Sequence, residues 1–238
     1  MRWTWQGLPA GTTPAEGPDH VIRLEVQNIP AFQAEEFMPP PNQVKARVDF
    51  IYDDEYFDST SDSYWHHVNR NRNEALESFV GKHKAMEEAV AEIVSPSDAP
   101  DVKLRKIYDR VQQVRNTNYE IRKTAQEEKR DKEKPAENVE EVWKRGYGTG
   151  IQLTWLYLGL VRAAGFEAYG CWVSSRSSYF FAKQTMENRK LNANVVLVRL
   201  DGKDLYFDPG AAFTPFGMLT WYETGTPGLC LDKQAERG

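Results

Sequence analysis

The sequence predicts an α+β protein in which a buried central helix packs on an antiparallel sheet. Residues 151–164 are apolar on nearly every side, which is typical of a helix enclosed by other elements. Residues 195–200 and 204–208 are two strand-like segments separated by an Asp-Gly pair, which favours a tight hairpin. Residues 166–173, just after the glycine that ends the helical pattern, are expected to form a third strand.

The N-terminal part of the chain, residues 1–60, is expected to be β structure. A short aromatic strand at 2–5 is followed by alternating apolar and polar residues at 20–26 and 45–52. Three strands with one apolar face cannot bury that face alone. They either pack on the helices that follow or are the last strands of a truncated β-sandwich domain, and we favour the second interpretation. Residues 61–238 then form the second domain.

The region between these two parts is predicted to be helical. An apolar stripe begins at Tyr64 and continues through 85–94, and a second amphipathic helix spans 98–114 with Asp98 as its expected cap. A short helix at 137–143 leads into the central helix. After residue 208 the chain is rich in glycine, proline and aromatic residues, which indicates an ordered loop over the sheet.

Composition excludes some classes of function. The formal net charge is −5 and the isoelectric point is about 5.5, so nucleic acid is not the expected partner. No run of apolar residues is long enough to cross a membrane, and the N-terminus lacks the pattern of a signal peptide. Cys171 and Cys230 have no metal-site spacing, and the sequence leaves open whether they are free or bridged. We expect neither a cofactor nor a metal.

The most informative stretch begins with a glycine-rich turn, GYGTG at 146–150, at the start of the central helix. Unpaired N–H groups and the helix dipole favour an anion or a thiolate there. The simplest role of Thr149 is to cap the helix. The second hairpin strand ends at Asp208, which precedes a proline. This arrangement has the architecture of an active site.

Several segments together resemble the transglutaminase-like (papain-like) superfamily. They are VEEVWKRGYGTG, LYLGLVRAAGFEAY and NVVLVRLDGKDLYFDPG. The sequence is most similar to bacterial members in which a β-sandwich domain of unknown function precedes the transglutaminase-like domain. The resemblance implies a central helix packed on an antiparallel sheet, with a Cys-His-Asp triad.

The resemblance does not extend to the catalytic cysteine and histidine. Aligned on the Arg-Ala-Ala-Gly helix end, Gly150 stands at the position of the family's nucleophilic cysteine, and its histidine falls at Ala193 or Asn194. Only Asp208 is retained. Glycine offers no nucleophile, and an aspartate that normally orients a histidine has none to orient. All four histidines of the chain lie upstream of the central helix.

We therefore expect a catalytically inactive transglutaminase-like domain that acts as a binding or structural module. The resemblance implies a larger, envelope-associated bacterial protein, with a peptide or protein bound in the degenerate cleft near Gly150, Asn194 and Asp208. One alternative is a thiol-dependent amide hydrolase or acyl transferase with a relocated nucleophile, either Cys171 or a residue other than cysteine. A second alternative is a purely architectural domain without a ligand.

Overall fold

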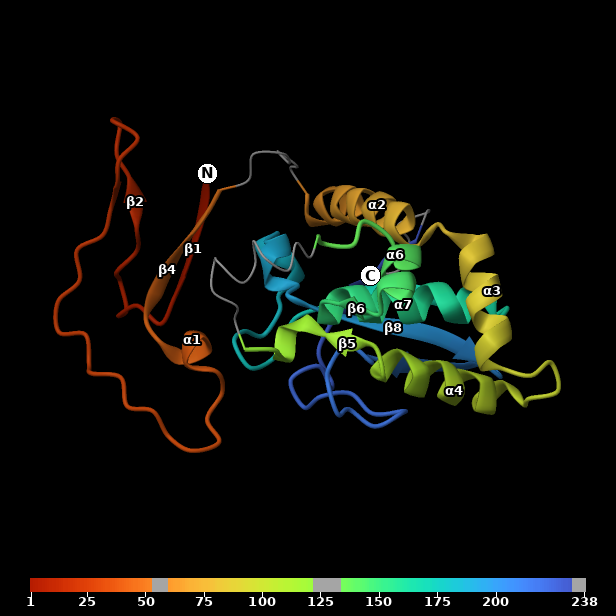
Figure 1. The fold of residues 1–238 in the computed structure, drawn as a ribbon. Coiled ribbons are helices and arrows are strands. Elements are labelled where there is room, and N and C mark those ends of the chain that lie inside the picture. The colour runs from red at the N-terminus through yellow and green to blue at the C-terminus, as the bar shows by residue number, and fades with distance from the viewer. Residues whose placement is uncertain (53–59, 122–133, 233–238) are drawn as a thin grey trace.

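The computed structural model describes residues 1–52, 60–121 and 134–232, and its fold is α+β (Figure 1). The helices are α1 (Pro41–Val44), α2 (Ser61–Val80), α3 (His83–Ile93), α4 (Pro100–Gln112), α6 (Val139–Arg145) and α7 (Gly150–Ala163), with short 3-10 turns at Thr117–Tyr119, Lys183–Thr185 and Asn188–Lys190. The strands are β1 (Arg2–Gln6), β2 (Ala15–Glu16), β3 (Ile22–Arg23), β4 (Arg47–Ile51), β5 (Arg115–Asn116), β6 (Tyr147–Gly148), β7 (Glu167–Val173), β8 (Ala193–Leu200), β9 (Lys203–Phe207) and β10 (Gly228–Cys230). None of these helices is long and apolar enough to cross a membrane.

The main sheet has four antiparallel strands in the order β10-β7-β8-β9. Because side chains alternate along a strand, the sheet has two distinct faces. Val196, Val198 and Phe207 belong to the main core, whereas Val195 and Leu197 belong to a smaller cluster with Cys171. We call the first the inner face and the second the outer face.

Helix α7 lies on the inner face and is the centre of the core. It contacts β7, β8 and the helices α2, α3, α4 and α6, and Leu156, Tyr157 and Leu160 have no exposed surface. The predicted central buried helix is therefore confirmed. Its N-terminus has a capping box, in which the Thr149 hydroxyl accepts from the Gln152 N–H and the Gln152 side chain accepts from the Thr149 N–H.

Two turns predicted from the sequence are also found. Gly165, just after α7, has a φ of +90°, a conformation that favours glycine. The turn between β8 and β9 has positive φ at both central residues, 51° at Asp201 and 73° at Gly202, as the favoured two-residue hairpin requires.

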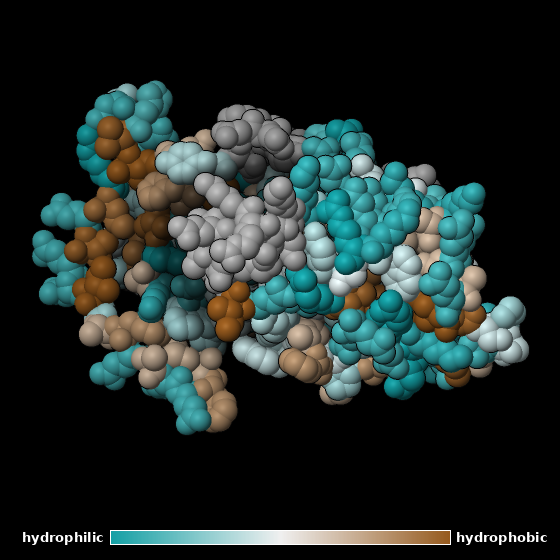
Figure 2. Space-filling model, in the orientation of Figure 1, coloured by the Kyte–Doolittle hydropathy of each residue, from teal (hydrophilic) through white to brown (hydrophobic). Residues whose placement is uncertain are grey.

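The N-terminal strands differ from the expectation. β1 pairs with β4, but the expected strand at 20–26 is reduced to β3, which pairs only with the two-residue β2. The three expected strands therefore do not share one sheet. The surface of this part carries many apolar residues, seen as brown areas over the N-terminal segment in Figure 2. Whether the segment closes a β-sandwich stays a prediction.

The predicted helices occur with shifted limits. The first predicted helical region is two helices, α2 and α3, separated at Gly81. The prediction that Asp98 caps the next helix is wrong, because Ala99 holds the cap position and makes no side-chain cap. The Asp98 carboxylate instead accepts from the Ser95 N–H and pairs with Lys106.

Strand β10 was not predicted, and it brings the two cysteines together. Cys230 on β10 lies opposite Cys171 on β7, and a disulfide joins them across 59 residues of sequence. The chain between them includes β8, β9 and the whole loop that follows β9. The disulfide therefore fixes the end of that loop against the sheet.

Reduction should lower the free energy of unfolding by about 4 kcal/mol, because an opened bridge of this span gives entropy back to the unfolded chain. Urea unfolding of the protein with and without dithiothreitol measures this difference. The Cys171→Ser/Cys230→Ser double variant is the control, and its midpoint should not respond to dithiothreitol. Equal midpoints of oxidised and reduced wild-type protein would contradict the expectation.

Candidate functional site

The candidate site lies where the chain after β9 crosses the N-terminus of α7. Thr154 lies one turn into α7, and its hydroxyl oxygen is 2.5 Å from the Asp208 carboxylate and 3.1 Å from the Gly150 carbonyl, so its single proton is shared between these two acceptors. The carboxylate also accepts from the Gly210 N–H at 3.0 Å. The fold thus brings together two predicted site residues, Gly150 and Asp208, through Thr154.

The backbone of Gly210 fills the space above Gly150. A Cβ atom built on Gly150 would lie 3.0 Å from the Gly210 carbonyl oxygen, and one built on Gly210 would overlap the Gly150 carbonyl and the Thr154 hydroxyl. Neither position therefore accommodates a side chain without movement. A thiol at residue 150 would face this carbonyl rather than open solvent.

Hydrogen bonds hold the covering loop in this place. The Asn116 amide donates to the Gly210 carbonyl at 2.8 Å, and the Tyr119 hydroxyl accepts from the Ala212 N–H at 3.2 Å. The buried Tyr108 hydroxyl donates to the Thr214 carbonyl at 2.8 Å. The loop is consequently tied to α4 and to the turn after it at three points.

The predicted histidine positions lie at the same end of the sheet as Asp208. Ala193 and Asn194 begin β8, opposite Val173 and Trp172 of β7. The β8–β9 register pairs Val196 with Phe207, so Asp208 follows on the neighbouring strand. The assignment of Ala193 or Asn194 to the family's histidine position stays a prediction.

The residue that sequence reasoning missed is Glu223, in the loop before β10. Its carboxyl group lies close enough to that of Asp208 for each to shift the pKa of the other, and it accepts from the Thr220 hydroxyl at 2.6 Å. Each of the two acidic residues is 6% exposed. Nothing in the segment TWYETG signals this pairing, because Glu223 reaches Asp208 only through the path of the loop.

Burial determines the protonation of this pair. Removal from water raises the pKa of Asp208, and burial together with the Asp208 charge raises the pKa of Glu223 to about 7. Tyr108 responds in the same direction, since burial and the nearby Asp208 raise its pKa. The Glu223 carboxyl group therefore holds its proton to a higher pH than an ordinary glutamate does and loses it around neutral pH.

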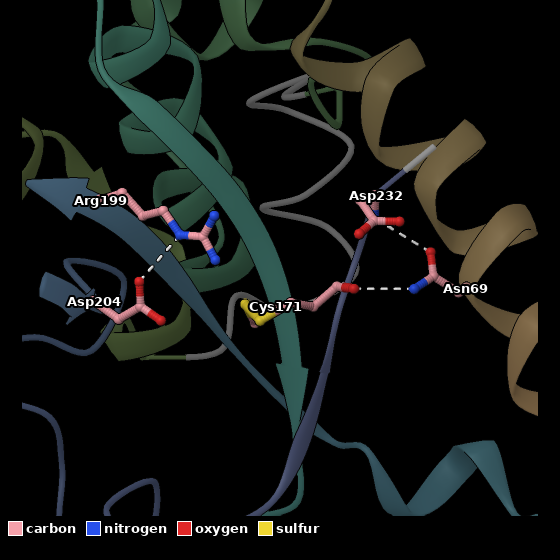
Figure 3. The surroundings of a disulfide bond; sticks show 6 residues. Asn69, Cys171, Arg199, Asp204 and Asp232 are labelled. Atoms are coloured by element: carbon pink, nitrogen blue, oxygen red, sulfur yellow. Dashed lines mark hydrogen bonds and ion pairs between the residues drawn. A yellow bond between two sulfur atoms is a disulfide. The ribbon is translucent and has the colours of Figure 1, made fainter. Parts of the chain in front are cut away.

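Cys171 cannot act as the relocated nucleophile in this structure. Nucleophilic attack requires a thiolate, and both cysteines of the chain are joined in the disulfide. Figure 3 shows this bridge between the strands, with Asn69 of α2 bonded to the far side of β10. The two adjacent histidines, His66 and His67, lie on α2. Among the described residues, no group of three or more His, Cys, Asp or Glu side chains could hold a metal ion.

Comparison with known proteins adds information on the fold. No protein-family model matches the sequence, and no curated protein matches it. A solved structure of a protein described as a "putative protease" from Parabacteroides distasonis is similar, with a TM-score of 0.55 and 16% identity. The match covers 86% of this chain and 37% of that chain. At this identity the likeness concerns the fold alone, and the chain spans little more than a third of its neighbour.

Gly210→Ala should destabilise the protein by about 3 kcal/mol, because the new methyl group overlaps the backbone at the start of α7. Gly159→Ala is the matched control in the same region. A Cβ there would meet Met86 at an ordinary 3.5 Å, and alanine is the better helix former. Urea unfolding should show Gly159→Ala as stable as the wild type or more so. Equal midpoints for the two variants would contradict the close packing of Gly210.

Stability should also fall as the pH rises from about 5 to about 8. The folded pKa of Glu223 lies above its unfolded value, so folding favours the protonated form, and this contribution is lost as the pH passes through the folded pKa. The loss should be about 3 kcal/mol. Glu223→Gln, which mimics the protonated side chain, should remove most of this dependence. A wild-type profile as flat as that of the variant would exclude the raised pKa.

Proposed function

We propose that this chain is a non-catalytic, transglutaminase-like binding domain that holds a short extended peptide against the edge of its main sheet. The non-catalytic half of the proposal is supported by Gly150 under the Gly210 carbonyl and by the disulfide that consumes both thiols. One observation supports the proposed binding of a peptide. A backbone edge with free hydrogen-bonding groups borders a groove at β10.

The hydrogen-bonding pattern shows which groups of β10 face outward. Leu231 donates to Gly170, and Ser174 donates to Pro227, so residues 227, 229 and 231 bond toward β7. Antiparallel pairs alternate, so the N–H and C=O of Gly228 and Cys230 point away from the sheet. The Cys230 carbonyl is taken by the Asn69 side chain at 3.0 Å. No described residue bonds to the Gly228 backbone.

The groove beside Gly228 has the dimensions and chemistry for an extended peptide. Its volume is about 660 Å³, and it lies between the N-terminal turns of α2, residues 181–184 and β10. Trp65 and Phe181, whose ring centroids are 5.1 Å apart, supply an apolar wall. The Trp65 indole N–H and the Ser61 hydroxyl both donate to the Lys183 carbonyl, which fixes the opposite wall. A peptide strand would bond to Gly228 and place one apolar side chain against the rings.

This proposal moves the predicted peptide site. The cleft near Gly150, Asn194 and Asp208 was the expected location, but the backbone of Gly210 lies there. The groove at β10 is on the other edge of the same sheet, because the strand order places β9 and β10 at opposite sides.

We also propose that the chain is part of a larger protein in the envelope of a bacterial cell. The disulfide supports an oxidising compartment, since such bonds persist mainly in secreted, periplasmic or surface proteins. The N-terminal strands are, in this proposal, the edge of a preceding β-sandwich domain. Exposed apolar side chains in the segments between these strands, among them Val21, Ile29 and Phe32, are consistent with a surface that another domain covers.

The peptide site can be tested without a known ligand. A phage-displayed library of random seven-residue peptides is selected on the intact protein, and the best sequence is synthesised and titrated. Phe181→Ala should weaken its binding about tenfold or more, as expected for the loss of an aromatic anchor. Phe180→Ala is the matched control, because Phe180 is the preceding residue, 52% exposed and outside the groove.

A second titration reports the strand pairing. N-methylation of the peptide at the residue opposite Gly228 should weaken binding, because it removes a donor without removing a side chain. Failure to select any peptide, or equal affinity of Phe181→Ala and wild type, would overturn the proposal in favour of a purely architectural domain.

A further inference from the structure

A second cavity lies on the outer face of the main sheet. Its volume is about 500 Å³, within the range of small-molecule sites. The sheet supplies an apolar floor made of the Cys171–Cys230 disulfide, Val195 and Leu197. Residues of the loop before β10, including Leu219 and Glu223, complete its lining.

Glu223 is the acidic group at the loop side of this cavity. The residue is 6% exposed, the Thr220 hydroxyl orients its carboxylate, and the Asp208 carboxyl group lies close by. Asp208 receives the Thr154 hydroxyl and the Gly210 N–H from the opposite side. The two carboxyl groups are thus held together where the inner core meets the cavity.

No described cation neutralises this pair. A buried charge is costly unless it is paired, yet the ion pairs of the described residues include neither Asp208 nor Glu223. Arg199 is the basic residue that lines the cavity. It is already paired with Asp204 at 3.2 Å and with Glu167 at 3.0 Å, as the Arg199–Asp204 contact in Figure 3 illustrates. The site therefore has an excess of negative charge.

We propose that the outer-face cavity binds an organic cation, with an ammonium group at Glu223 and an unbranched aliphatic body over Val195, Leu197 and the disulfide. A cation compensates the buried charge, and the apolar floor favours the hydrocarbon chain. Two sources share this chemistry, a free alkylamine and the side chain of a lysine in another protein. The inference does not depend on the peptide groove, since the two cavities share only Gly228 and the groups that bind the cation, Glu223, Val195 and Leu197, line the outer-face cavity alone.

Calorimetric titration of the intact, oxidised protein tests the proposal with three probes. Pentylammonium should bind, whereas 1-pentanol, which has the same chain without the charge, should bind at least tenfold more weakly. Nα-acetyl-lysine methylamide distinguishes the sources. If it binds as well as pentylammonium, a lysine side chain is the ligand, and if only pentylammonium binds, a free amine is. Equal affinity of pentanol and pentylammonium, or no binding of either cation, would overturn the proposal.

Variants locate the binding. Glu223→Gln keeps the size and hydrogen bonding of the side chain and removes its charge, so pentylammonium affinity should fall at least tenfold. Glu140→Gln is the control, because Glu140 lies on α6 and pairs with Lys144 on the same helix. Unchanged affinity of folded Glu223→Gln would exclude Glu223 as the ligand group.

Proton release supplies a test that needs no variant. The acidic and basic groups facing Glu223 are Asp208, Tyr108 and Tyr222, with Arg199 and Asp204 across the cavity. A bound cation favours the deprotonated carboxyl pair, so affinity should rise between about pH 6 and pH 8. Titrations in two buffers of different ionisation enthalpy should show proton release near pH 6.5. Affinity that does not vary with pH, with no proton released, would contradict cation binding at this pair.

Discussion

The contact between Gly210 and the first turn of α7 is the constraint on which the rest of the site depends. A glycine is needed at 210 because the backbones approach more closely than a Cβ there allows, and a Cβ at 150 would lie a tight 3.0 Å from the Gly210 carbonyl oxygen. Thr154 and the Gly210 N–H then converge on the Asp208 carboxylate. These hydrogen bonds hold the loop after β9 on the first turn of α7, and the contact is a packing junction between them.

The loop held by this junction connects the two faces of the sheet. It begins at Asp208 over the inner core, passes Glu223 at the outer-face cavity and ends in β10, where the disulfide fixes it. Because the same loop supplies Glu223 and the edge strand, both candidate binding sites depend on its path. The buried carboxyl pair costs stability at neutral pH, and a ligand cation would offset that cost. Stability and binding are linked through this pair for that reason.

The match with a solved structure from P. distasonis agrees with the α+β architecture and does not extend to chemistry. The described residues offer three groups to a ligand. These groups are a backbone edge at Gly228, an aromatic wall in the groove and an unneutralised carboxyl pair. None of them includes a free thiol, because both cysteines are joined in the disulfide.

The sequence by itself determined the local elements. Several features could be predicted because they depend on contacts within a few residues. They are the buried helix α7, the Thr149 cap, the Gly165 turn and the Asp-Gly hairpin. The sequence also identified Gly150 and Asp208 as neighbours, through the resemblance. Only the tertiary structure decided that Gly210 covers Gly150, that Cys171 pairs with Cys230 and that Glu223 reaches Asp208. Each of these depends on the course of residues 209–227, a loop whose path is set by hydrogen bonds to distant residues and has no periodic pattern in the sequence.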